Sequence, residues 1–265
     1  MNVAVNLDKR KWVDTLARVG LTAKGVVYVT LGILAFMAAF EIGSQSNANA
    51  NRNGVFNFIQ DAPGGTVLLV LLSGGLLCYS LWRFVQAFTQ DKDVKWSKRL
   101  LYVFSGLAYL SIAYTAIRLH LHKSGGDGDS KQKLAANLMD ASYGQWLAGA
   151  AALIMAGIGI YQIWFGLSEK YKKHVQQLHD RARQSILLYS GKIGYVARGI
   201  VWLIIAFLLA KAALHDDASE AGDSGEAFQL LEKASYGSYL LGALGLGLIA
   251  YGVFNFIRAR YEQFD

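Results

Sequence analysis

Three polar residues recur at one position of a pattern that repeats along the chain, and together they could bind a metal ion. Shifting Glu41 by 81 residues gives His122, and shifting it by 174 residues gives His215. Two imidazoles and one carboxylate are ligands that suit a divalent metal ion. Glu41, His122 and His215 therefore form a hypothetical metal site. The alternative is three unconnected polar residues at a water boundary.

Other residues that could do chemistry are scarce. The middle of each long apolar run holds no Asp, Glu, Lys, Arg or His. Since ionisable residues at membrane depth mark proton relays and ion pathways, their absence argues against a relay, a charge-coupled pump and a midplane acid–base enzyme. The chain has no Walker loop, HExxH or GxSxG motif. We expect no enzyme and no cofactor, and an enzyme built on the hypothetical metal site is the least favoured reading.

The elements that must position these residues are long apolar segments. Hydrophobic residues make up 54% of the chain and charged residues 17%. Six apolar runs each have about 20 residues or more, enough for a helix to cross a hydrocarbon core about 30 Å thick. The sequence predicts an all-α polytopic membrane protein with six transmembrane helices. The runs are 19–40, 65–88, 100–119, 143–167, 194–214 and 236–257.

Internal similarity divides the chain into three tandem helical hairpins. "ARVGLTAKGVVYV" at 17–29 is echoed by "GKIGYVARGIVWL" at 191–203, and "DASYG" at 140–144 by "KASYG" at 233–237. Hairpins with an even number of spans all enter the membrane in one direction, so an axis along the membrane normal relates them. We expect a single membrane domain, 1–265, with a pseudo-threefold arrangement. Its repeats are 16–90, 97–171 and 190–261.

Small residues fall at equivalent positions of the repeats and predict a packing seam. Residues seven apart share one face of a helix, and helices in lipid associate where small residues let their backbones approach. The seam residues are Gly25, Gly106, Gly199, Gly32, Ala113, Ala206, Ser80, Gly159 and Gly252.

Basic residues concentrate on one side of the predicted spans, which holds 19 of the 26 Lys and Arg. The positive-inside rule places this side, with both termini, in the cytoplasm. Lys24 and Arg198 are equivalent, about one turn inside the basic ends of their helices. We expect their stems to run along apolar surface while the charges snorkel to the head groups, with an anion-binding vestibule as the alternative. The predicted cytoplasmic basic anchors are Arg18, Lys24, Arg99, Lys192 and Arg198.

The repeated motifs resemble a known bacterial family. "ARVGLTAKGVVY" and "ARGIVWL" at the starts of odd helices, and "ASYG" opening the fourth and sixth, are similar to a membrane-protein family catalogued as domain of unknown function 1206. The resemblance covers residues 16–261 and implies three two-helix repeats, with no established activity or site residues. The second repeat departs at Leu101 and Ser105, where the others have glycine and a basic residue.

The sequence favours a non-enzymatic membrane module that binds lipid or a protein partner. The alternative is a small transporter or channel for an uncharged substrate, using the axis between the repeats. The bilayer is the expected partner, and nucleic acid is not, because the one-sided basic charge is explained by topology. The basic linker 168–185 is a possible contact for a protein partner or for self-association.

Overall fold

The computed structural model describes residues 2–42, 52–61, 63–89, 96–121, 144–174, 181–215 and 224–262, and these contain no strand. Six long helices supply six candidate membrane spans, so the predicted all-α, multi-pass fold is confirmed. They are α1 (Asn2–Ala39), α3 (Gly65–Thr89), α4 (Trp96–Leu121), α6 (Gly144–Leu167), α7 (Arg181–His215) and α9 (Gly237–Tyr261). The shorter elements are α2 (Arg52–Asp61), the 3-10 helix η2 (Lys170–His174) and α8 (Ser224–Glu232).

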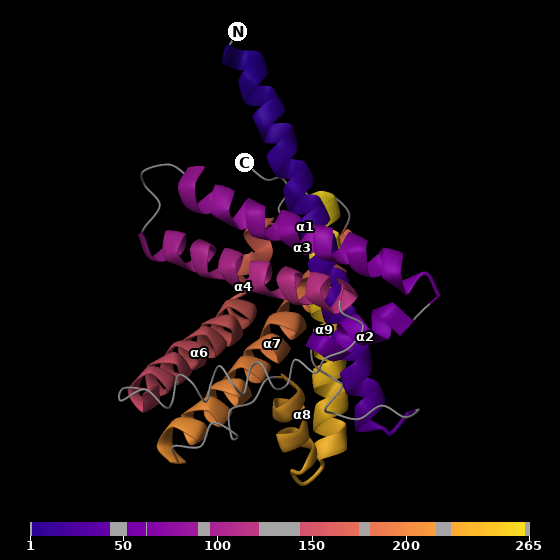
Figure 1. Ribbon diagram of the computed structural model, residues 1–265, viewed down its shortest axis with the longest axis vertical. Helices are drawn as coiled ribbons and strands as arrows, with labels where there is room; N and C mark the ends of the chain where they lie inside the picture. Colours follow the sequence, from indigo (N-terminus) through magenta and orange to yellow (C-terminus); the bar gives the residue numbers. More distant parts are fainter. Residues whose placement is uncertain are drawn as a thin grey trace.

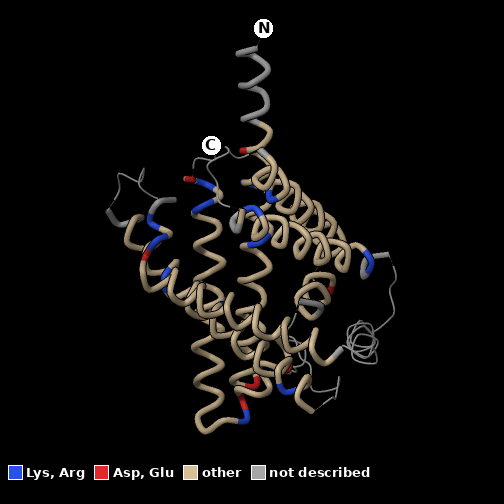
Figure 2. The backbone as a smooth tube through the Cα atoms, turned by 90° about the vertical axis from the view of Figure 1, so that its left-hand side faces the viewer, with Lys and Arg blue, Asp and Glu red and all other residues tan. Residues whose placement is uncertain are grey.

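The N- and C-terminal ends of the chain lie at the same end of the bundle, as Figure 1 shows. Lys and Arg lie mainly toward the ends of the helices, whose middle stretches are almost free of charge (Figure 2). We call the end that holds the start of α1 and the end of α9 the basic end. An even number of spans brings both termini to one side, as the sequence predicts.

The long helices pack in the order α4, α3, α1, α9, α7, α6. Three of these contacts join different repeats: α3 with α4, α6 with α7, and α9 with α1. In each, the second helix of one repeat packs on the first helix of the next. These three repeat junctions give the cyclic arrangement that pseudo-threefold symmetry requires.

The small-residue positions lie at the repeat junctions, where backbones touch. A Cβ on Gly252 would lie 2.8 Å from the carbonyl oxygen of Gly25, and a Cβ on Gly199 would lie 2.8 Å from that of Gly159. At the third junction the Ser80 hydroxyl donates to the Gly106 carbonyl over 2.7 Å. One heptad on, a Cβ on Gly32 would lie 2.5 Å from the Gly245 carbonyl oxygen. Ala113 and Ala206, which are equivalent to Gly32 in the other repeats, are buried.

One contact of the ring is missing. Helices α1 and α3 pack together within the first repeat, as do α7 and α9 within the third. Helices α4 and α6 of the second repeat do not pack along each other, and in Figure 1 they diverge. The six helices therefore form a ring that is open at one side, and we call this break the α4–α6 gap.

The sequence explains the gap. In the first repeat, a Cβ on Gly20 of α1 would lie 2.5 Å from the Cα of Tyr79, and in the third a Cβ on Gly194 would lie 2.5 Å from the Cα of Tyr251. The second repeat has Leu101 at this glycine position, where a side chain prevents such an approach.

A second pair of positions shows the same difference between the second repeat and the other two. Gly75 faces Ala23 in the first repeat and Gly247 faces Ala197 in the third. Their equivalents in the second repeat are Ile154 and Phe104. Leu101, Phe104 and Ile154 are 51%, 53% and 60% exposed, respectively. In lipid, bulky apolar residues gain little by leaving the acyl chains, so nothing draws α4 onto α6.

At the basic end, basic side chains form polar contacts across the repeat junctions. Arg18 on α1 donates from Nη1 to the carbonyl oxygens of Ala259 and Arg260, both at 2.9 Å, at the end of α9. This satisfies carbonyls that a helix end leaves unpaired. Lys192 on α7 lies 3.7 Å from the carboxylate of Glu169, just after α6. Hydrogen bonding to Lys172 holds the pKa of Glu169 below its usual value.

The repeat junctions should be sensitive to added volume. Gly159→Val places a Cβ 2.9 Å from the Gly199 carbonyl oxygen. We expect a loss of about 1–3 kcal/mol in stability, measured as a lower Tm in detergent. Gly157→Val on the same helix is the control, because its Cβ meets nothing within 4 Å. Equal losses in the two variants would contradict the assignment of the seam to this junction.

Candidate functional site

The open ring encloses a central cavity of about 260 Å³. This is far more than the roughly 10–15 Å³ that one water molecule needs. All six long helices contribute to its wall, and Ser224 of α8 lines it as well. Most of the wall is apolar; the lining residues with polar groups include Tyr28, Tyr109 and Arg198. Within the described residues, Tyr109 of α4 and Met155 of α6 line the cavity from the two helices that flank the α4–α6 gap.

Arg198 is the charged residue in the described wall of the cavity. Its Nη1 donates to the hydroxyl of Tyr251 over 2.7 Å. Its guanidinium carbon lies 5.4 Å from the ring centroid of Tyr28 and 5.1 Å from that of Tyr251. Ring faces within about 6 Å attract a cation, so two tyrosines hold this arginine.

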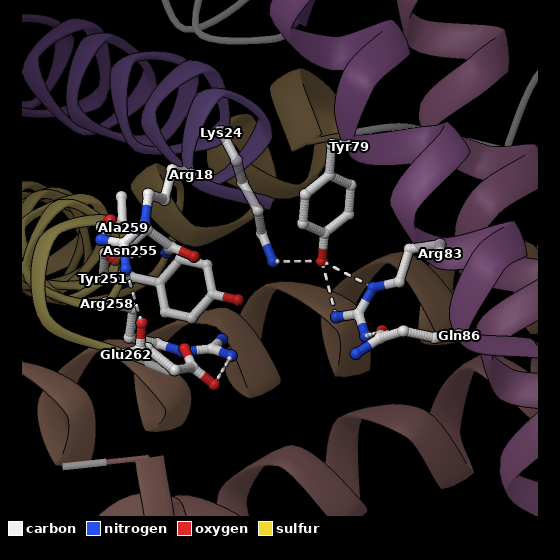
Figure 3. Close-up of polar contacts among 10 residues, drawn as sticks. All are labelled: Arg18, Lys24, Tyr79, Arg83, Gln86, Tyr251, Asn255, Arg258, Ala259 and Glu262. Atoms are coloured by element: carbon white, nitrogen blue, oxygen red, sulfur yellow. Dashed lines mark hydrogen bonds and ion pairs between the residues drawn. The ribbon is translucent and has the colours of Figure 1, made fainter. Parts of the chain in front are cut away.

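Lys24 lies beside Arg198, within a cage of aromatic rings. Its Nζ is 5.0, 5.4 and 5.2 Å from the ring centroids of Tyr79, Tyr109 and Tyr251. The ammonium also donates to the Tyr79 hydroxyl over 3.3 Å, as Figure 3 shows. The side chain is 3% exposed. Tyr251 thus contacts both Lys24 and Arg198, and Tyr109 belongs both to the cage and to the cavity wall.

A third cation approaches from α3. Arg83 donates from Nε and Nη2 to the Tyr79 hydroxyl, at 3.0 and 2.6 Å, and from Nη1 to the Gln86 side chain at 2.9 Å. In Figure 3 the Tyr79 hydroxyl lies between Lys24 and Arg83. One neutral oxygen therefore accepts hydrogen bonds from two cationic side chains. We call Lys24, Arg83, Arg198 and the tyrosines that contact them the basic centre.

The cations of the basic centre have no carboxylate in direct contact among the residues that the structure describes. Over the described part of the chain, no salt bridge reaches Lys24, Arg83 or Arg198. The carboxylate of Glu262 is already bound by Arg258, whose Nε and Nη2 donate to its two oxygens. The positive charges of Arg198, Arg83 and Arg258 repel a charged Lys24, and the carboxylate of Glu262 attracts it. Buried charge without a counter-charge is costly, so this arrangement favours an anion.

Glycine packing explains why these residues converge. Gly20 and Gly194 bring α1 against the backbone of Tyr79 and α7 against that of Tyr251. Lys24 and Arg198 follow these glycines by four residues, about one helical turn, so they lie on the same face and point into the bundle. The second repeat has neither the glycine nor the base: Leu101 and Ser105 take the two positions.

The placement of Lys24 and Arg198 differs from the expectation from sequence. Snorkelling to the head groups requires a stem that lies on the lipid-facing surface, whereas Lys24 is buried and Arg198 lines an internal cavity. Ring faces replace water as partners of the charge. Arg18 and Lys192 instead bind the ends of neighbouring helices, and Arg99 lies near the start of α4, partly buried.

Arg83, Gln162 and Asn255 lie at equivalent positions of the even helices, and no hydrogen bond to another described residue joins them to a different hairpin. Asn255 donates to the Tyr251 carbonyl of its own helix, and Arg83 bonds to its own helix as well. Gln162 is buried, and its side-chain oxygen has no hydrogen-bond partner among the described residues. Repeat equivalence identifies these positions but not their partners.

The hypothetical metal site stays a prediction. Glu41 lies just after α1 in a left-handed conformation with φ of 52°, and His215 is the exposed last residue of α7. His122 lies outside the described residues. Within those residues, no group of three or more His, Cys, Asp or Glu comes close enough to hold a metal ion.

Comparison with known proteins agrees with the repeat geometry. The family described as Domain of Unknown Function (DUF1206) matches residues 19–90, 100–168 and 193–262. The chain belongs to this family. An uncharacterized protein of Bacillus subtilis, YxxB, is 27% identical over 268 residues, which cover 98% of this chain and 94% of that protein. No solved structure matches the chain.

The hydroxyl of Tyr79 should stabilise the basic centre. Tyr79→Phe removes the oxygen that accepts from Lys24 and Arg83 and leaves buried cationic donors without it. We expect a loss of about 1–3 kcal/mol, seen as a lower Tm in detergent. Tyr161→Phe, at an exposed position of α6, is the control and should leave Tm unchanged. Equal Tm values for the two variants would show that this hydroxyl is not an important acceptor.

Proposed function

We propose that this protein is a non-enzymatic lipid-binding module of the bacterial inner membrane. The observation that supports the proposal most strongly is the α4–α6 gap beside the central cavity. An amphiphile could leave the bilayer between α4 and α6 and place part of its length against the apolar wall. Leu31, Leu76 and Ile112 in that wall suit an acyl chain. We further propose that the basic end is cytoplasmic, because basic residues favour that side.

The transporter alternative also relies on the cavity, but two features make it the weaker candidate. Arg198 in the wall suits an anionic ligand better than an uncharged one. Ser224 lines the cavity from α8, whose Ala227 and Phe228 are buried. A helix packed into the bundle in this way favours a pocket entered from the side over a channel along the axis.

The first test fills the cavity. Met155→Trp adds a bulky ring to the cavity wall on α6, while Leu153→Trp adds the same ring at a position on α6 that is 76% exposed. After reconstitution in phospholipid vesicles and mild detergent release, native mass spectrometry should show one retained lipid on the original protein and on Leu153→Trp. We expect Met155→Trp to lose this lipid.

Retention that is equal in all three proteins would contradict binding in the cavity. A complete lack of retained lipid on the original protein would contradict the proposed function itself. Thermal unfolding of each variant checks that the added ring has not disrupted the fold, because overpacking alone costs about 1–3 kcal/mol.

A further inference from the structure

Arg198 lines the cavity and has unused hydrogen-bonding capacity. Arg198 donates from Nη1 to Tyr251, while its buried Nε has no hydrogen-bond partner among the described residues. Buried donors in folded proteins are almost always paired. A guanidinium presents its donors as a planar fork that matches the oxygens of a carboxylate or a phosphate. The unpaired donor and the place of Arg198 in the cavity wall together point to a missing acceptor.

The charges around Arg198 indicate what that acceptor is. Lys24 and Arg198 both contact the Tyr251 ring, and Lys24 and Arg83 both donate to the Tyr79 hydroxyl. Tyrosine rings and hydroxyls solvate these cations but carry no net charge. A neutral ligand would fill the space and leave the positive charge uncompensated, whereas an oxyanion would compensate it.

We propose that the cavity binds the oxyanion of an anionic amphiphile, with Arg198 as its direct contact and Lys24 as a supporting charge. The oxyanion is a carboxylate or a phosphate ester, and its apolar part follows the wall toward the α4–α6 gap. This inference rests on the proposed lipid binding and adds the chemical class of the ligand. The same oxyanion chemistry could come from a free anion in water, which the experiment below distinguishes.

The experiment measures lipid selectivity. The protein is reconstituted in vesicles with equal amounts of phosphatidylglycerol and phosphatidylcholine of the same acyl chains, released in mild detergent and weighed by native mass spectrometry. We expect the retained lipid to be mainly phosphatidylglycerol. Arg198→Gln should lower the ratio of the two retained lipids about tenfold, the effect of losing one charge-assisted hydrogen bond.

Two further variants keep the test specific. Lys211→Gln removes the same charge from an exposed position of α7 and should leave the ratio unchanged. Arg198→Lys keeps the charge without the fork and should restore part of the selectivity, which a merely misfolded variant would not do. Lys24→Gln should lower the ratio less than Arg198→Gln, because Lys24 does not line the cavity.

The possible outcomes distinguish the oxyanion proposal from the lipid-binding proposal. Equal retention of both lipids by the original protein would overturn the oxyanion assignment and leave lipid binding intact. Retention of neither would overturn lipid binding. In that case inorganic phosphate is titrated into the detergent-solubilised protein: binding that Arg198→Gln abolishes would identify a free anion as the ligand, and no binding would overturn the oxyanion site as well. If Lys211→Gln lowers the ratio of retained phosphatidylglycerol to phosphatidylcholine as much as Arg198→Gln does, the selectivity comes from overall charge and the oxyanion site is overturned.

Discussion

Close backbone contact between helices is the constraint on which the rest of this structure depends. Acyl chains are as apolar as the side chains that face them, so helices in a bilayer gain little from burying apolar surface against one another. They associate where small residues let their backbones meet. Gly25 with Gly252, Gly199 with Gly159 and Gly106 with Ser80 supply that contact at the three repeat junctions. Contacts between repeats form three helix pairs, and contacts within the first and third repeats, α1 with α3 and α7 with α9, join these pairs into the open ring.

The contact between the two helices of a repeat connects packing to the site. Where Gly20 and Gly194 are present, the helices of a repeat meet, and the cation one turn later is carried into the bundle among tyrosines. In the second repeat Leu101 and Ser105 replace the glycine and the cation, and the ring opens. The same departure from the repeat thus removes one cation from the centre and leaves the α4–α6 gap beside the cavity that Arg198 lines.

The sequence alone predicts the helices, the repeats and the small-residue positions, because each depends on local composition or on a shift of the chain against itself. It also identifies Leu101 and Ser105 as departures. The sequence does not predict in which direction around its helix a side chain points. Lys24 was expected at the lipid surface because its depth suits snorkelling, but depth does not distinguish a lipid-facing stem from one facing the axis. The tyrosine cage around Lys24 draws on α3, α4 and α9, and only the packing of these helices brings its rings together.

The most direct measurement is a cryo-EM reconstruction of the protein in nanodiscs that contain phosphatidylglycerol, with a bound antibody fragment to aid alignment. We predict elongated density between α4 and α6 that continues into the cavity and ends against Arg198. A map in which α4 packs along α6 and protein side chains fill the cavity would contradict the account.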